Sequence, residues 1–248
     1  RARALLMPSI QTKYRPPITS LIGHHSGQDI FVVGTGTSLW GFDFKQLEGR
    51  ITIALNNAVD FFVPTYFMFS DHPLWRRYEK HKIDPRTTVI TREDSSRDLS
   101  RSGHCCFHNQ IYVFNRVTES KECLPKDANL FCSHTVALPG IMLAWKLGAR
   151  RIFMLGIDAY SLPHATYADG ARQEPRGRLE HVSVDQSCEL IIEGRHKVWQ
   201  QEMKDLRESF TWRGVYKDKF PDSGVFNLSP LSTITAWEKV DRAHVGLL

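Results

Sequence analysis

One histidine and two tyrosines occupy positions where group-transfer chemistry could be carried out. Tyr160 and Tyr167 follow an apolar run, and His196 opens an expected helix after a long charged segment. A histidine titrates near neutral pH and is the usual general base for a sugar or alcohol hydroxyl. Tyrosine hydroxyls are neutral donors that can stabilise a departing phosphate without a metal. These residues indicate transfer to a hydroxyl, unless the tyrosines only pack and His196 only caps its helix.

Two strand ends carry groups that suit a nucleotide. The loop Gly34-Thr-Gly-Thr-Ser38 offers backbone N–H groups and hydroxyls, enough to hold a phosphate. It is not the dinucleotide fingerprint, because Leu39 stands where the third glycine belongs and no clear acidic residue follows about 20 positions later, which disfavours NAD. Asn56-Asn57 suit a ribose or base edge. The alternatives are a tight turn without a ligand and an Asx turn.

These residues need a parallel sheet to bring them together. Two similar apolar runs, about 120 residues apart, each stop at a glycine-containing turn, as buried parallel strands do at a binding crevice. Strands are expected at 30–33, 50–55, 65–69, 87–91, 111–114, 152–155 and 225–228. Helices are expected at 75–82, 136–147, 197–210 and 234–240, with a short helical or turn segment at 39–47. The pattern predicts an α/β fold with a single Rossmann-like, mostly parallel sheet flanked by helices.

Composition predicts an ordinary globular chain. It has 248 residues, 42% of them hydrophobic and 24% charged, enough for one α/β domain. Residues 1–28 are expected to form an extended N-terminal arm and residues 29–248 a single nucleotide-binding domain. A charged, aperiodic stretch at about 161–195 is expected to be a mobile lid. Arg172, Arg176 and Arg178 on this lid could close over a phosphate.

Charge and cysteine content bound the partners. The net charge is +5, which favours an anionic ligand and leaves nucleic acid possible. No apolar run approaches the roughly 20 residues of a membrane span, and no secretory signal is evident. Five cysteines without a disulfide pattern favour a cytoplasmic setting. His104-Cys-Cys-Phe-His108 lacks the Cys-x-x-Cys spacing of zinc sites, so no metal is expected.

Taken in order, these segments resemble the bacterial sialyltransferases of glycosyltransferase family 42, and also the broader group of pterin-pyrophosphokinase-like proteins. The resemblance covers roughly residues 29–71 and 132–240. It is carried by Val33-Gly-Thr-Gly-Thr-Ser-Leu39, Leu55-Asn-Asn57, Ser133-His-Thr135, the run from Lys146 to Tyr160, Tyr167, His196 and Asn227-Leu-Ser-Pro-Leu-Ser232. The family's first loop usually reads Asn-Gly-Pro-Ser and its third strand ends in Asn-Pro, whereas this chain has Thr35-Gly-Thr-Ser38 and Ser70-Asp71-His72-Pro73.

The resemblance implies a GT-A-like variant of the nucleotide-binding fold. It also implies inverting, metal-independent transfer of a sialic-acid-like sugar from a nucleotide sugar, with a CMP-sugar favoured, to a glycan or other hydroxyl acceptor. By resemblance His196 is the catalytic base, and Tyr160 and Tyr167 stabilise the leaving phosphate. The implied nucleotide contacts are Thr35, Gly36, Ser38, Asn56, Ser70, Ser133, Thr135, Asp158, Ser229 and Ser232.

Three alternatives stay open. A pyrophosphokinase of the pterin type would need Mg²⁺ held by carboxylates at strand ends, for which Asp71 and Asp158 are the candidates. A phage-type enzyme that glycosylates DNA would show salt-sensitive duplex binding. A non-catalytic nucleotide-binding module would tolerate loss of His196. The sequence leaves the oligomeric state unknown.

Overall fold

The computed structural model describes residues 15–70, 83–94, 109–132, 135–158, 197–208, 222–230 and 232–248. In these ranges the chain forms one nine-stranded sheet in the order β6-β5-β4-β3-β2-β1-β7-β8-β9. Every neighbouring pair of strands is parallel. The strands are β1 (Asp29–Val33), β2 (Ile51–Leu55), β3 (Tyr66–Phe69), β4 (Thr88–Arg92), β5 (Ile111–Val117), β6 (Asn129–Phe131), β7 (Arg151–Leu155), β8 (Gly224–Asn227) and β9 (Glu238–Lys239).

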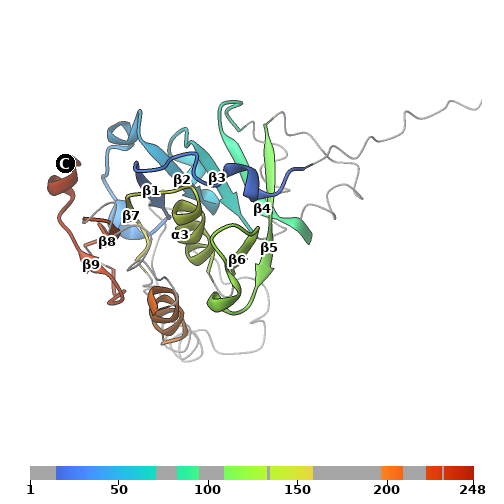
Figure 1. The fold of residues 1–248 in the computed structure, drawn as a ribbon. Coiled ribbons are helices and arrows are strands. Elements are labelled where there is room, and N and C mark those ends of the chain that lie inside the picture. Colours follow the sequence, from blue (N-terminus) through green and yellow to red (C-terminus); the bar gives the residue numbers. More distant parts are fainter. Residues whose placement is uncertain are drawn as a thin grey trace, which may run out of the picture.

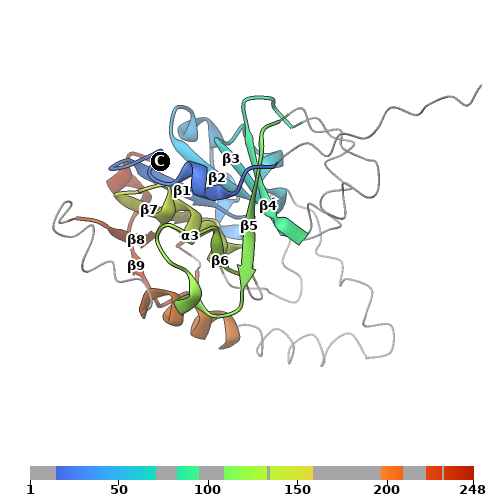
Figure 2. The ribbon, with the colours of Figure 1, turned by 45° about the vertical axis from the view of Figure 1, so that its right-hand side comes forward.

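Alternate side chains of the central strands fill two cores. In β1, Ile30 and Val32 pack with the helix α3 (Ala137–Lys146), whereas Phe31 and Val33 pack on the opposite face. Figures 1 and 2 show α3 lying across the centre of the sheet, where it contacts β1, β2 and β7. The helix of residues 197–208 shares the core of α3 through Met203 and Leu206, which are fully buried. Both faces of the parallel sheet are therefore covered, as such sheets require.

The opposite face is covered mostly by short 3-10 helices. These are η2 (Thr37–Leu39), η3 (Phe44–Leu47) and η4 (Asn56–Asp60), and the C-terminal segment adds the buried Leu247. Each of the three follows a strand within a few residues or leads into the next one. The loops on this face are therefore positioned directly by β1 and β2.

The expected α/β parallel fold and its seven strands are confirmed, with bounds shifted by a few residues. Helices were expected at 136–147 and 197–210; α3 and residues 197–208 confirm them. The short strand β6 was not expected, because three residues carry too little pattern. The expected basic helix at 75–82 and the lid at about 161–195 lie outside the described residues. Within the described residues no helix is long and apolar enough to cross a membrane.

Two expectations were wrong. Residues 234–240 do not form a helix: they contain a bend at 236–237 and the two-residue strand β9. Ile234, Ala236 and Trp237 join the core of α3 from this segment, and the β-branched Ile234 and Thr235 are poorer helix formers than unbranched residues. Residues 15–28 of the expected arm are also not extended: they form the 3-10 helix η1 (Ile18–Leu21) and a series of turns, and η1 packs against the core of α3.

A buried ion pair fixes the C-terminal end of α3. Lys146 Nζ donates to Asp127 Oδ1 at 2.7 Å, to Asp127 O at 2.9 Å and to Leu124 O. The Lys146 side chain is only 1% exposed, so its charge depends on these acceptors. Burial alone would raise the pKa of Asp127, but hydrogen bonds from Lys146 and from backbone N–H groups outweigh it and lower that pKa.

We expect Asp127→Asn to lower the free energy of unfolding by about 1.5–3 kcal/mol at pH 7, since a hydrogen bond between charged groups is lost beside a buried cation. Because the pKa of Asp127 is depressed in the folded state, its contribution is present above the unfolded pKa of about 4 and is lost as pH falls through the folded pKa. Urea unfolding from pH 7 down to pH 2 measures this, and the gap between wild type and variant should close toward acid.

The matched control is Glu119→Gln, which removes the carboxylate from an exposed pair with Lys121. Exposed pairs contribute little to stability because water screens them, so this variant should unfold almost as the wild type does. Equal losses in both variants at pH 7 would contradict the role assigned to Asp127.

Candidate functional site

The strand order reverses between β1 and β7. From β1 the chain adds β2 to β6 on one side of the sheet, whereas β7, β8 and β9 lie on the other side. Ligands of open parallel sheets bind at the carboxyl ends of the strands, where the order reverses. The loops at this point are Gly34–Leu39 after β1 and residues 156–158 after β7. The two junctions singled out in the sequence are therefore neighbours, joined along the β1–β7 ladder from Asp29–Arg151 to Val33–Leu155.

Ser38 and Asp158 join these two loops. Ser38 N–H donates to Asp158 Oδ2 at 2.8 Å, and Ser38 Oγ donates to Asp158 Oδ1 at 2.5 Å. Ser38 is 7% exposed and Asp158 is 3% exposed. A buried carboxylate needs donors to offset its loss of solvation, and Ser38 supplies one to each oxygen. This Ser38–Asp158 pair thus holds the loops together.

The glycines of the first loop allow the loops to approach closely. Gly34 N–H donates to Leu155 O and Gly36 N–H to Gly156 O, each at 2.8 Å. A Cβ atom at Gly36 would lie 2.5 Å from the Asp158 carboxyl group, and one at Gly34 would overlap Gly156 O. Side chains are therefore excluded at both positions, which explains the Gly-x-Gly pattern without a dinucleotide.

The loop after β8 supports the loop after β7. Ser229 Oγ accepts from Ile157 N–H at 3.2 Å, and Ser232 Oγ donates to Ile157 O at 3.0 Å. Ser229 is 0% exposed and Ser232 is 2% exposed. The hydroxyls expected to contact a nucleotide have internal partners here, as do those of Ser38 and the carboxylate of Asp158. In this structure these four residues build the site, and their contact with a ligand stays a prediction.

Three residues that follow the ends of β1 and β2 have polar groups without a hydrogen-bond partner among the described residues: Thr35, Thr37 and Asn56. Because Gly34 and Gly36 point their N–H groups toward β7, the N–H of Thr35 points toward β2. The β1–β2 register ends at Val33–Ala54, since Asn56 begins η4. Among the described residues, no hydrogen bond uses the backbone N–H or the hydroxyl of Thr35 or Thr37.

Asn56 lies two residues beyond Ala54, as Thr35 lies two beyond Val33. Its φ is +51°, the only positive φ of a non-glycine residue in the described structure. Its Oδ1 atom is buried and has no hydrogen-bond partner among the described residues. Strained backbone and a buried polar atom without a partner are both costly, and they concentrate at functional sites.

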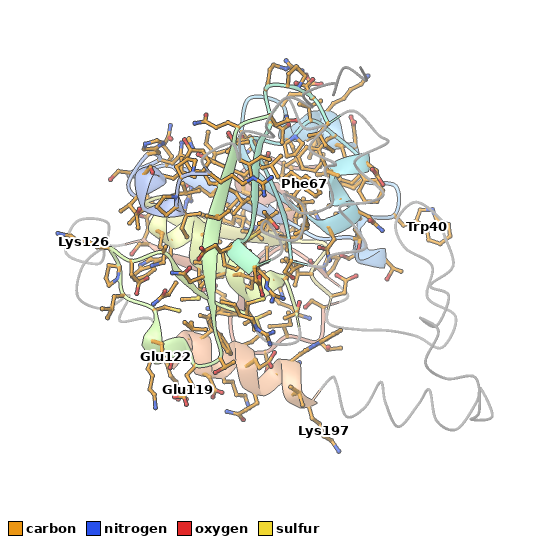
Figure 3. The ribbon with its side chains drawn as sticks, turned by 90° about the vertical axis from the view of Figure 1, so that its right-hand side faces the viewer. Trp40, Phe67, Glu119, Glu122, Lys126 and Lys197 are labelled. Atoms are coloured by element: carbon orange, nitrogen blue, oxygen red, sulfur yellow. The ribbon has the colours of Figure 1, made fainter. Side chains whose placement is uncertain are left out.

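The loop after β1 ends at the surface of the protein. Leu39 is 1% exposed and fixes the loop to the core, whereas Trp40 is 73% exposed. Figure 3 shows Trp40 pointing away from the body of the molecule, while Phe67 lies within it. Thr35, Gly36 and Thr37 are half-exposed and come just before the buried Ser38 and Leu39.

The other expected site residues fall into two groups. Ser70 ends β3, one strand beyond β2, and is half-buried. Thr135 precedes α3, and its Oγ1 accepts from the N–H of Ala137, the first residue of the helix, at 3.2 Å. The remaining expected site residues lie outside the described residues, and the roles assigned to them stay predictions: Ser133, Tyr160, Tyr167 and His196.

Arg242 was not expected at this site. It begins the 3-10 helix η6 (Arg242–Val245) near the C-terminus. Its Nη2 donates to Ser38 O at 2.6 Å and its Nε to Leu228 O at 3.0 Å. The sequence holds 32 lysines and arginines, and nothing in the pattern around Arg242 distinguishes it from the others. Only the tertiary fold brings it to the switch point.

Asp158 is one of the two carboxylates considered for Mg²⁺ coordination. Both of its carboxylate oxygens already accept from Ser38. The other carboxylate considered for Mg²⁺, Asp71, lies outside the described residues. Within the described residues no group of three or more His, Cys, Asp or Glu side chains is arranged to hold a metal ion.

No protein-family model and no curated protein matches this chain. Among solved structures, it is similar to the MAf glycosyltransferase from Magnetospirillum magneticum AMB-1, with a TM-score of 0.55 and 15% identity over 94% of this chain and 37% of that one. The chain thus spans little more than a third of that protein. It is also matched by the sialyltransferase CstII from Campylobacter jejuni in complex with cytidine-5'-monophosphate, at TM-score 0.49 and 12% identity over 87% and 85% of the two chains. The first comparison shows that this fold is found in a glycosyltransferase.

We expect Ser38→Ala to lower the free energy of unfolding by about 1–3 kcal/mol, because it leaves a buried carboxylate oxygen without its donor. Thr35→Ala is the control within the same loop: its hydroxyl has no partner in the described structure, so stability should change by no more than about 0.5 kcal/mol. Thermal or urea unfolding of both variants measures this difference in stability. A Ser38→Ala protein as stable as the wild type would mean that the Ser38–Asp158 pair does not hold the loops.

Proposed function

We propose that the chain transfers a sugar from a nucleotide donor, a CMP-sugar before others, to an acceptor hydroxyl with inversion and without a metal. The observation that carries this proposal is the cluster of open polar groups at the switch point. Within the described residues no hydrogen bond uses the N–H groups of Thr35 and Thr37 or the Asn56 side chain, whereas the N–H groups of Gly34, Gly36 and Ser38 in the same loop are paired. Such groups suit a ligand with phosphate oxygens and a base or ribose edge.

The glycosyltransferase fold of the magnetospirillum protein supports a transfer reaction on this scaffold. In the proposed reaction the donor phosphate lies at the Thr35–Thr37 backbone, and Asn56 contacts the nucleoside. His196 removes the proton from the acceptor hydroxyl as the new bond to the sugar forms. Tyr160 and Tyr167 donate hydrogen bonds to the nucleotide phosphate as its bond to the sugar breaks. Positioning and hydrogen bonds to the departing phosphate then lower the barrier.

A second candidate, Mg²⁺-dependent pyrophosphoryl transfer, places different demands on the same residues. It requires carboxylates to hold the metal beside the phosphates. Asp158, which accepts two hydrogen bonds from Ser38, would have to hold the metal with its remaining lone pairs. The metal dependence of nucleotide binding separates the two reactions.

Nucleotide binding in EDTA is the first test. We expect calorimetry to show that the protein binds CMP more tightly than UDP, and that Mg²⁺ leaves the CMP affinity unchanged. Binding only after Mg²⁺ is added would favour the phosphotransferase.

Asn56→Gly is the matched variant for this test. Glycine adopts the positive φ of this position without strain, so the variant removes the amide and leaves the backbone intact. CMP affinity should fall by about 10-fold, equivalent to one hydrogen bond of about 1.4 kcal/mol, with little loss of stability. Unchanged affinity would remove Asn56 from the site.

Replacement of His196 tests the chemical step. His196→Ala should lower kcat by about 10² to 10⁴, the usual effect of losing a general base, and should hardly change CMP affinity, because the base faces the acceptor. Turnover and melting temperature are measured on the same preparation, with a CMP-sugar donor. A folded variant that keeps the wild-type kcat would exclude His196 as the base.

A further inference from the structure

Arg242 joins two loops of the site that are far from it in sequence. It lies 204 residues after Ser38, and its Nη2 donates to Ser38 O at 2.6 Å. Its Nε donates to Leu228 O at 3.0 Å, in the loop after β8. The guanidinium carbon lies 5.2 Å from the centroid of the Phe42 ring. One side chain therefore contacts the loop after β1, the loop after β8 and the ring of Phe42.

The chemistry of arginine suits this position. Its planar guanidinium holds two acceptors in fixed directions, which the single ammonium of lysine cannot do. Burial lowers the pKa of Arg242, while the charges of Asp158 and Asp241 oppose that shift, and the group remains a cation because a guanidinium is not deprotonated in proteins. Both bonded acceptors are backbone carbonyls, so the contact fixes main-chain positions in the two loops.

We propose that Arg242 is a positioning residue that fixes the loop of residues 34–39 in the conformation that binds the nucleotide phosphate. It bonds to the carbonyl of Ser38, next to the open N–H of Thr37 in the same loop. The Ser38–Asp158 pair holds this loop from the side of β7, and Arg242 holds it from the side of the C-terminal segment. The part of the proposal that concerns nucleotide affinity rests on the proposed function.

The chain offers a matched control in Arg50. Its Nε donates to Gln46 O at 2.9 Å, and its Nη1 and Nη2 donate to Val245 O and Gly246 O at 3.2 Å each. Its guanidinium lies 5.1 Å from the centroid of the Phe31 ring. Arg50 thus holds the same C-terminal segment with the same kind of contacts, but its hydrogen bonds do not reach the loops of the site.

The experiment compares Arg242→Gln, Arg242→Lys and Arg50→Gln in the full chain. Hydrogen exchange of a peptide covering residues 34–40 reports the loop without any ligand, and calorimetry with CMP in EDTA reports affinity. We expect Arg242→Gln to speed exchange in this peptide by about 10-fold and to weaken CMP binding by about 10-fold, the loss of roughly one charged hydrogen bond. Arg242→Lys should restore part of both, and Arg50→Gln should leave both within about two-fold of the wild type.

Two results would overturn the proposal. One is unchanged hydrogen exchange of the 34–40 peptide in Arg242→Gln. The other is an equal change in exchange and CMP affinity in Arg50→Gln, which would mean that the whole C-terminal segment, rather than Arg242, stabilises the loop. If Arg242→Gln does not fold, Arg242→Lys alone tests the proposal. Faster exchange of the 34–40 peptide together with weaker CMP binding in Arg242→Lys supports the proposal, and wild-type values of both contradict it. If the wild type binds no CMP but only the Arg242 variants speed loop exchange, the proposed function fails while the positioning role stands.

Discussion

The hydrogen bonds between Ser38 and Asp158 are the contact on which the architecture of the site depends. A carboxylate that is 3% exposed is tolerated only with donors on its oxygens, and Ser38 supplies both of them from the neighbouring loop. The close approach this requires excludes side chains at Gly34 and Gly36. The loops after β1 and β7 therefore behave as one unit. Ser229, Ser232 and Arg242 form hydrogen bonds to the backbone of this unit.

This arrangement divides the polar groups of one short loop into two sets. The N–H groups of Gly34, Gly36 and Ser38 point toward β7 and are paired, and those of Thr35 and Thr37 are not. Thr35 lies between two residues of the extended chain whose N–H groups bond to the residues at and after the end of β7, whereas the N–H of Thr37 is the first of the 3-10 helix η2, where N–H groups have no partner within the helix. Which N–H groups stay open thus depends on the neighbouring strand and on where η2 begins, and a list of residue types at a strand end cannot reveal it.

The same reasoning explains how far the sequence predicts this structure. β1 and β7 were predictable because apolar, partly β-branched runs that stop at glycine are typical of buried parallel strands. Ser38, Asn56, Ser70, Asp158 and Ser229 do follow the ends of strands, but the hydroxyls of Ser229 and Ser232 hold the backbone of Ile157, and ligand contact at these residues stays a prediction. The helix expected at 234–240 is also absent, and β9 lies there instead. Serine bonds equally well to its own chain, to a distant loop or to a ligand, and only tertiary contacts choose among these.

Charge imposes a further condition on an anion-binding site built around a carboxylate. Asp158 lies directly behind the loop that is proposed to hold a phosphate, and at close range its charge repels an anion. The two donors from Ser38 spread that charge, and Arg242 lies near enough for the charge of Asp158 to act on its titration. The guanidinium therefore offsets the carboxylate while it fixes the loop. If the proposed phosphate binds at the Thr35–Thr37 backbone, this compensation of charge would keep Asp158 from repelling it, and the C-terminal segment would then act on the site electrostatically as well as sterically.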